Sequence, residues 1–336
     1  MIDPAQADIG LPHGTAALAL SLAAAACPPG WVIDPDAVLA QLLMPLVVGA
    51  RPPARPPRPA PGGGWVHDDS VDDALVAALA EGRDAEGLAA AAQECWLPIT
   101  PYRTCRALTG RNPVEARQER PDPARVRVLD LTAMWAGPLC TRLLAEWGAE
   151  VTTIEPAVRP DGFRGSPAQF TVLDVGKRRV DIDLRTPAGR DAFERLVAQS
   201  DLVVESFSRR VMPNLGYADL RAINPAVSTV SIRSFPVGSP ERDWVAYGRG
   251  VHAAAGLGMW NGRPQPVPIA YPDPLTGFTA FAACVAAIGR AINVEVTLAE
   301  AIAPLRPGPL ATGDPCTVRR LAVATNGAMA APLVPS

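Results

Sequence analysis

The clearest pattern along the chain is a run of short apolar segments separated by helical ones. Segments typical of buried strands lie at residues 126–131, 151–156, 178–184, 201–207 and 227–232. Between the first two, Leu139, Leu143 and Leu144 are spaced as on one helix face, with Pro138 suited to its first turn and Gly148 to its end. The pattern predicts an α/β fold: a Rossmann-like, open, mostly parallel sheet with flanking helices.

Ligands of such sheets bind at the carboxyl ends of the strands. We therefore expect a binding site in the loops that follow Leu131, Glu155, Glu205 and Ile232. The glycines after the first strand do not form a G-x-G-x-x-G motif, so they do not by themselves predict a dinucleotide site.

Local composition divides the rest of the chain. We expect an Ala-rich helical segment at 1–46, a Pro- and Gly-rich exposed linker at 47–64, a helical segment at 65–120, the sheet domain at 126–260, a helix followed by a strand and a second helix at 270–305, and a tail at 306–336. Residues 10–43 parallel residues 273–305: each has a Pro-containing start, an Ala-rich helix, a short strand and the start of a second helix. An internal repeat at this spacing is not that of a solenoid.

The composition excludes several classes of protein. The 336 residues are 48% hydrophobic and 19% charged with a formal net charge of −3, so no basic surface for nucleic acid is indicated. The Ala-rich run at 15–27 is too short to span a membrane, and we interpret it as a buried helix. The six cysteines show no C-x-x-C spacing and the three histidines lie far apart, which indicates free thiols in a reducing cytoplasm and no metal site.

Several separated motifs together resemble the family III CoA-transferases, the CaiB/BaiF group that includes formyl-CoA transferase and 2-methylacyl-CoA racemase. They are VLDLTAMWAGPLCTRLLAEWGAEVTTIEP (128–156), LDVGKRRVDIDL (173–184), LGYADLRAINPAVSTVSIRSF (215–235) and YPDPLTGFTAFAACVAAIGRA (271–291). They occur in the family's own order and cover about half of the chain with their connecting segments. Residues 65–120 resemble the family's C-terminal part. The resemblance therefore implies a rearranged, permuted or fused member that lacks the family's small domain, with a CoA-binding domain at 126–260.

Asp273 has two interpretations. An Asp followed by Pro at the start of a helix is an ordinary helix cap. In the resembling family this position holds the aspartate that attacks an acyl-CoA thioester, so the resemblance implies that Asp273 is the catalytic nucleophile. Both interpretations can hold together, because a helix N-terminus also stabilises a carboxylate.

The resemblance also implies residues near CoA. Lys177, the only lysine of the chain, and Arg178 match a basic pair near the nucleotide end of CoA, and Arg233 matches a lysine-bearing position there. The alternative for the pair is a solvated turn between strands. Trp135 could stack on adenine or simply pack, and Ala136 and Ser206 are the remaining candidates for cofactor contact. No metal is implied.

The racemase branch of the family uses a His-Asp pair for α-proton exchange. Tyr247 and Gly248 occupy those positions here, and we interpret His252 as a structural residue, so racemase chemistry is disfavoured. The resemblance implies CoA transfer between an acyl-CoA and a carboxylic acid by a cytoplasmic homodimer without nucleic-acid or membrane partners. Loss of family contacts leaves an alternative open: a repurposed or non-catalytic member that acts on a carrier-bound or non-CoA biosynthetic substrate, as an isomerase, cyclase or binding subunit.

Overall fold

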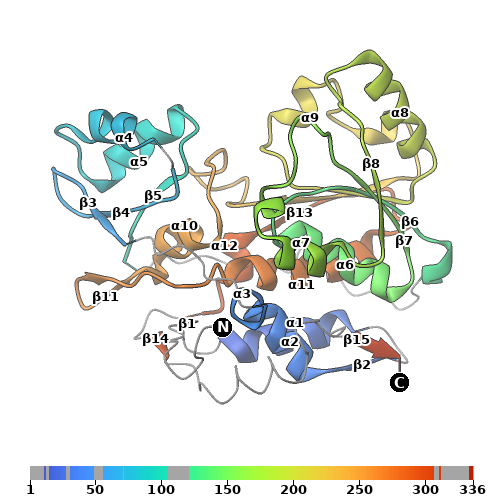
Figure 1. Cartoon of the computed structure of the whole chain (residues 1–336), viewed down its shortest axis with the longest axis horizontal. Helices are drawn as coiled ribbons and strands as arrows, with labels where there is room; N and C mark the ends of the chain where they lie inside the picture. The colour runs from blue at the N-terminus through green and yellow to red at the C-terminus, as the bar shows by residue number, and fades with distance from the viewer. Residues whose placement is uncertain are drawn as a thin grey trace.

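A computed structural model describes residues 11–12, 15–27, 31–48, 56–70, 72–104, 121–305, 310–311 and 333–335. Figure 1 shows three parts: a large parallel sheet with its helices, a small antiparallel sheet carrying α4 and α5, and the N-terminal helices α1 to α3 below α11. In these ranges no helix is long and apolar enough to cross a membrane.

The large sheet confirms the α/β prediction. Its strands are β6 (Arg127–Leu131), β7 (Glu150–Ile154), β8 (Lys177–Val180), β9 (Leu202–Glu205), β10 (Ser228–Arg233) and β13 (Asn293–Thr297), in the order β13-β10-β9-β6-β7-β8. All five strand pairs are parallel. The order reverses between β6 and β9, and in doubly wound sheets this reversal opens the crevice where ligands bind.

Helices cover both faces of the sheet. Those of the domain are α6 (Ala136–Trp147), α7 (Pro167–Asp174), α8 (Pro187–Ala198), α9 (Val211–Asn214), α11 (Pro272–Ala287) and α12 (Leu298–Ala301). Because side chains alternate along a strand, Val128 enters the core shared with α6 and α11, while Leu129 and Leu131 enter the core shared with Phe193 of α8. The helix α6 begins and ends as predicted, with Gly148 in the left-handed region at φ 110°.

The N-terminal segment combines short strands and helices. It contains β1 (Leu11–Pro12), α1 (Thr15–Ala26), β2 (Trp31–Ile33), α2 (Pro35–Leu42) and α3 (Met44–Val47). The short strands β14 (Leu310–Ala311) and β15 (Leu333–Pro335), in the predicted tail, pair with β1 and β2. The helix α1 packs against α11, the helix that it parallels in sequence (Figure 1). Both regions have the order helix, strand, helix, which is compatible with the predicted repeat.

The small antiparallel sheet begins inside the predicted linker. Its strands are β3 (Arg58–Pro59), β4 (Trp65–Asp68) and β5 (Ile99–Pro101), and it carries α4 (Asp73–Ala80) and α5 (Ala85–Glu94). Residues 58–64 form β3 and a turn in which Ala60 N donates to Gly64 O, and Gly63 and Gly64 have φ of 108° and 82°. The prediction of a linker is therefore wrong for these residues, because the glycines form a tight turn here. Residues 105–120 lie outside the described residues.

A connecting region links the two sheets. It comprises α10 (Gly248–His252), a short π-helical stretch (Ala253–Leu257) and a hairpin of β11 (Met259–Trp260) and β12 (Arg263–Pro264). The side-chain amide of Gln93 forms hydrogen bonds to both backbone groups of Val245, and Arg103 N donates to Ala253 O at 3.0 Å. The small sheet is thereby held against the region that precedes α11.

Candidate active site

Asp273 lies in the first turn of α11, at the carboxyl edge of the parallel sheet. The helix runs from Pro272 to Ala287 and is followed by β13, so its N-terminus lies at the edge where the strands end. Tyr271, not Asp273, occupies the N-cap position, and the structure records no side-chain capping bond there. The described residues offer Asp273 Oδ2 no hydrogen-bond partner. Simple capping therefore does not account for this carboxyl group.

The surroundings of Asp273 make its ionised form costly. Burial raises the pKa of Asp273 to about 7, and the negative charge of Asp69 adds to the rise. The backbone amides of Asp273 and Gly248 and the charge of Arg249 act in the opposite direction. A carboxyl group with this pKa exists in both protonation states near neutral pH, which suits a group that must gain and lose charge during a reaction.

Gly248 allows the close approach of α10 to this carboxyl group. A Cβ at residue 248 would overlap Asp273 Oδ2 and would also crowd Ala270. Glycine is therefore required here by space rather than by backbone conformation. Gly248, which stands at the position of the racemase Asp, thus lies against Asp273.

Four predicted site residues lie at the same edge of the sheet, near the β6–β9 reversal. Trp135 and Ala136 follow β6 at the start of α6 and are buried. Ser206 follows β9, and its Oγ accepts a hydrogen bond from Ala133 N at 3.2 Å. A Cβ on Gly277, one helical turn after Asp273, would lie 3.1 Å from Ala136 O, so α6 and α11 begin side by side.

Arg233, the fourth of these residues, is bound by Glu205. The guanidinium group pairs with both carboxylate oxygens of Glu205, and NH1 lies 2.9 Å from Oε2. Both side chains are largely buried at the ends of neighbouring strands. Arg233 Nε has no hydrogen-bond partner among the described residues. A phosphate that used Arg233 would have to share it with Glu205.

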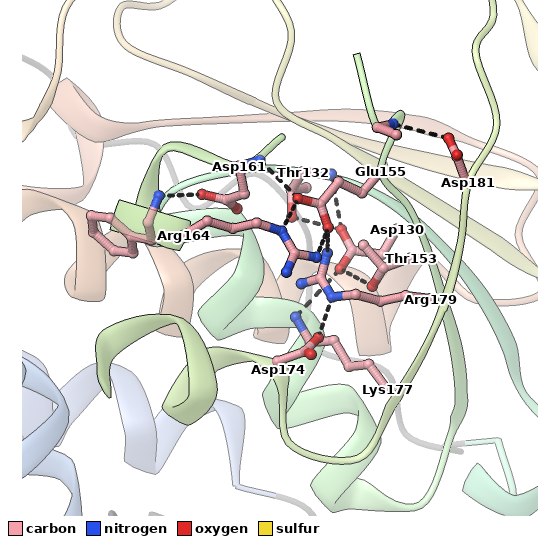
Figure 2. A network of polar contacts seen from close by, with 12 residues as sticks. Asp130, Thr132, Thr153, Glu155, Asp161, Arg164, Asp174, Lys177, Arg179 and Asp181 are labelled. Carbon is pink, nitrogen blue, oxygen red and sulfur yellow. Dashed lines mark hydrogen bonds and ion pairs between the residues drawn. The ribbon is translucent and has the colours of Figure 1, made fainter. Parts of the chain in front are cut away.

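Lys177 and Arg178 begin β8, so their backbone lies toward the edge of the sheet opposite to Asp273. The long side chain of Lys177 nevertheless reaches the first turn of α6, which begins at Ala136. Lys177 Nζ is fully buried and donates to Thr141 Oγ1 at 2.7 Å and Pro138 O at 2.8 Å, and lies 3.3 Å from Asp130 Oδ2. Figure 2 shows this side chain pointing at Asp130. Contact between Lys177 and CoA stays a prediction, and it would require the ammonium group to leave these partners.

Arg178 is exposed, and its NH2 donates to Thr152 Oγ1 at 2.9 Å. The neighbouring strand ends in an ion cluster (Figure 2), in which Glu155 accepts from Arg164 and Arg179. Hydrogen bonds from Arg164 lower the pKa of Glu155 to about 2. The loop after β7 is therefore fixed by ion pairs within the protein, and the positive charges of the cluster are neutralised internally.

Residues that the sequence patterns did not single out also surround Asp273. Asp69 and Arg249 both act on its charge, and they act in the same two directions on Tyr102, whose pKa is raised mainly by burial. Asp69 comes from the small sheet, more than two hundred residues before Asp273 in sequence. The only local signal is an acidic pair, Asp68 and Asp69, at the end of a strand that contains His67.

His252 lies in a setting compatible with the structural role expected from the sequence. It is fully buried in α10, with Nδ1 3.0 Å from Tyr271 Oη and Nε2 2.8 Å from Gln265 O. Burial lowers its pKa to about 4. A neutral ring with both nitrogens occupied is not arranged as a general base.

A metal centre gains no support from the described part of the chain, which contains no group of three or more His, Cys, Asp or Glu side chains suited to hold an ion. The cysteines described there, Cys27, Cys95, Cys140 and Cys284, are free thiols. Cys105 and Cys316 lie outside the described residues.

Comparison with known proteins identifies relatives of the sheet domain. The chain is 36% identical over 153 residues to a succinyl-CoA–D-citramalate CoA-transferase of Chloroflexus aurantiacus, covering 43% of this chain and 38% of that protein. It is 30% identical over 197 residues to a formyl-CoA:oxalate CoA-transferase of Escherichia coli, covering 53% and 47%. The chain spans less than half the length of these curated relatives.

Solved structures agree with this likeness. A hypothetical protein of Mycobacterium tuberculosis superposes with a TM-score of 0.50 at 29% identity, over 55% of this chain and 57% of that one. A CaiB/BaiF family protein of Brucella suis gives 0.50 at 26% identity, over 55% of both chains. The family model CoA-transferase family III matches residues 124–313, which is more than half of the sequence. The chain therefore belongs to CoA-transferase family III.

Proposed function

We propose that this protein transfers CoA between an acyl-CoA and a carboxylic acid, with Asp273 as the nucleophile. The observation that carries the proposal is the position of Asp273: in the first turn of α11, buried, with Oδ2 unpaired and its pKa raised to about 7. Two relatives named as CoA-transferases support the reaction class. A poorly solvated carboxylate is a stronger nucleophile than a solvated one, and a helix N-terminus favours the anionic state that attacks.

The proposed reaction begins with bond formation between an Asp273 carboxylate oxygen and the thioester carbonyl carbon. The carbon–sulfur bond breaks, and the products are an aspartyl mixed anhydride and CoA thiolate. The CoA thiolate then attacks the aspartyl carbonyl of the anhydride, which gives an aspartyl-CoA thioester and releases the donor carboxylate. The incoming carboxylate attacks this thioester, CoA thiolate leaves, and a second mixed anhydride forms. Attack of the thiolate on the new acyl carbon gives the new acyl-CoA and frees Asp273. Amides at the start of α11 are suited to stabilise the developing oxyanion.

For CoA itself, the proposed site is the β6–β9 crevice. Trp135, Ala136, Ser206 and Arg233 lie at this edge of the sheet, and the crevice at the reversal of strand order is where doubly wound sheets bind ligands. A homodimer and a cytoplasmic location stay predictions that the family likeness supports.

The proposal is tested by trapping the anhydride. The purified protein is incubated with succinyl-CoA and hydroxylamine, without an acceptor acid, and the tryptic peptide that contains Asp273 is analysed by mass spectrometry. We expect a hydroxamate on Asp273 and release of free CoA. Asp273→Asn should give neither, whereas Asp183→Asn, a surface carboxylate paired with Arg185, should behave as the wild type. A hydroxamate at another residue, or none with formyl-CoA and acetyl-CoA as well, would overturn the proposal.

A second function is favoured by one specific observation. The predicted phosphate ligands Lys177 and Arg233 are both bound by buried carboxylates, of Asp130 and Glu205. A family member with a carrier-bound or non-CoA substrate needs no free phosphate ligands. Calorimetric titration with CoA, and with CoA lacking its 3′-phosphate, separates the two functions. Binding that weakens without that phosphate supports CoA transfer, and no binding of either supports the second function.

A further inference from the structure

A buried imidazole with an unpaired nitrogen lies in the small antiparallel sheet. His67 is part of β4, and its side chain is 2% exposed. Its Nε2 lies 3.0 Å from Asp69 Oδ2, a charge contact without hydrogen-bond geometry, and neither ring nitrogen has a hydrogen-bond partner in the described part of the chain. Buried polar atoms are almost always paired, so an unpaired one indicates a bound molecule, a water or a chemical role. An imidazole with a carboxylate at one nitrogen and the other nitrogen open is arranged to take up a proton.

Direct contacts join β4 and its neighbour to the region around Asp273. His67 is the register partner of Thr100 on β5, and Thr100 Oγ1 donates to Gly250 O at 3.0 Å in a buried setting. Gly250 belongs to α10, the helix that begins at Gly248 against the Asp273 carboxyl group. The small sheet therefore forms one wall of the surroundings of Asp273.

Charges act across this wall. The carboxylate of Asp69 raises the pKa of Asp273, and the charge of His67 lowers that of His252. Among the described residues, Asp69 and Arg249 act on the charge of Asp273. The other titratable groups of the elements packed here are His67 and Tyr102 from the small sheet and its end, His252 from α10, and Tyr271 before α11. Of the two imidazoles in this set, only His67 has an unpaired nitrogen, since both nitrogens of His252 have partners.

We propose that His67 and Asp69 form a proton-transfer pair for the Asp273 site, supplied by the small sheet that precedes the sheet domain. This proposal adds a proton-transfer step to the proposed CoA transfer, and it rests on that proposed function. Asp69 holds the imidazole through Nε2 and stabilises its cation, while Nδ1 exchanges a proton with the site.

In the first step, the proton moves only among these side chains. The protonated Asp273 gives its proton to His67, directly or through water, and becomes the attacking carboxylate. Its oxygen forms the bond to the acyl carbon, the carbon–sulfur bond breaks, and CoA leaves as the thiolate while the proton stays on the imidazolium. The products are the mixed anhydride, protonated His67 and CoA thiolate, and no oxidant or reductant is involved.

The pair is tested first without any substrate. The chain has only three histidines, so ¹⁵N resonances of the imidazoles can be assigned by substitution and followed against pH. In the wild type we expect the His67 nitrogens to show an inflection that coincides with the titration of Asp273. Asp273→Asn should remove that inflection. Asp68→Asn, which alters the adjacent carboxylate paired with Arg58, should retain it. Identical His67 titrations in the wild type and Asp273→Asn would overturn the proposal.

The kinetic test uses the pH profile of CoA release from succinyl-CoA. We expect Asp69→Asn to shift the rising limb of the profile to lower pH, because a negative charge near Asp273 is removed. His67→Gln should lower kcat by about 10²-fold with little change in KM, the usual scale for loss of a proton-transfer group. Unchanged profiles in both variants would contradict the pair even if trapping identifies Asp273 as the nucleophile. If trapping fails, the imidazole titration still decides whether His67 and Asp273 are coupled. If His67→Gln does not fold, the same titration remains available, because it uses the wild type and Asp273→Asn.

Discussion

Lys177 and Asp130 form a fully buried ion pair between β8 and β6, with Nζ 3.3 Å from Oδ2. Thr153 donates to Asp130 Oδ2 and Thr132 donates to Oδ1 (Figure 2). Thr141 Oγ1 also donates to Oδ2, so the carboxylate has several donors. Burial lowers the pKa of Lys177, and Asp130 opposes that change. The pair ties the edge of the sheet to the start of α6, which also carries the predicted CoA contacts at Trp135 and Ala136.

Removing the ammonium group should be strongly destabilising. Lys177→Met leaves Asp130 buried without its cation, and loss of one partner of a buried ion pair typically costs about 3–5 kcal/mol. Urea unfolding followed by circular dichroism measures the change. Arg185→Met, which breaks an exposed pair with Asp183, is the control and should leave the unfolding midpoint unchanged. A Lys177→Met chain as stable as the wild type would show that the pair is not formed.

The carboxyl group of Asp273 should make stability depend on pH. Its folded-state pKa of about 7 is above the ordinary value of 3.8, so the folded chain binds the extra proton between these values. Stability from this group is therefore fully present below pH 4 and is lost as the pH rises through 7. Asp273→Asn removes this pH dependence of stability. The difference in melting temperature, variant minus wild type, should therefore increase from pH 5 to pH 8. A constant difference would mean that Asp273 is solvated.

Space at Gly248 should be coupled to the same carboxyl group. Gly248→Ala introduces a Cβ that overlaps Asp273 Oδ2, and overpacking of this kind typically costs about 1–3 kcal/mol. In an Asp273→Ala background much of the overlap is gone, so the added destabilisation should be smaller, although crowding by Ala270 remains. A double-mutant cycle of unfolding free energies measures this coupling. Additive effects would contradict the contact.

The ion cluster at the end of β7 should protect the protein in acid. The pKa of Glu155 is lowered to about 2, so its stabilising contribution is present above the ordinary pKa of about 4.5 and is lost as the pH falls toward 2. Glu155→Gln, which keeps the shape of the side chain, should lose less stability than the wild type between pH 5 and pH 2. Melting temperatures over this range provide the measurement. Parallel curves for the two proteins would rule out the role assigned to Arg164 and Arg179.

The sequence alone determined the parallel sheet, the helix that follows its first strand and the family. Apolar strand runs and helical spacing such as that of Leu139, Leu143 and Leu144 are set by neighbours in sequence, so a local pattern reports them. Asp273 could be proposed as a site residue from the sequence, because the motif that contains it is also a continuous stretch of the chain. The tail strands β14 and β15 and the turn at residues 58–64 could not be read in this way, since their pairing depends on segments distant in sequence.

Only the tertiary structure decided how charged side chains are used. The resemblance places Lys177, Arg178 and Arg233 in one class of phosphate ligand. In the structure the first two begin β8, the Lys177 ammonium group is buried against Asp130 and the first turn of α6, and Arg233 is paired with Glu205. The sequence likewise could not show that the charge of Asp69 acts on Asp273, because the small sheet that carries β4 is held against α10 by tertiary contacts such as Thr100 Oγ1 to Gly250 O. The raised pKa of Asp273 arises from the same enclosure: desolvation is a property of the folded surroundings, not of the order of residues along the chain.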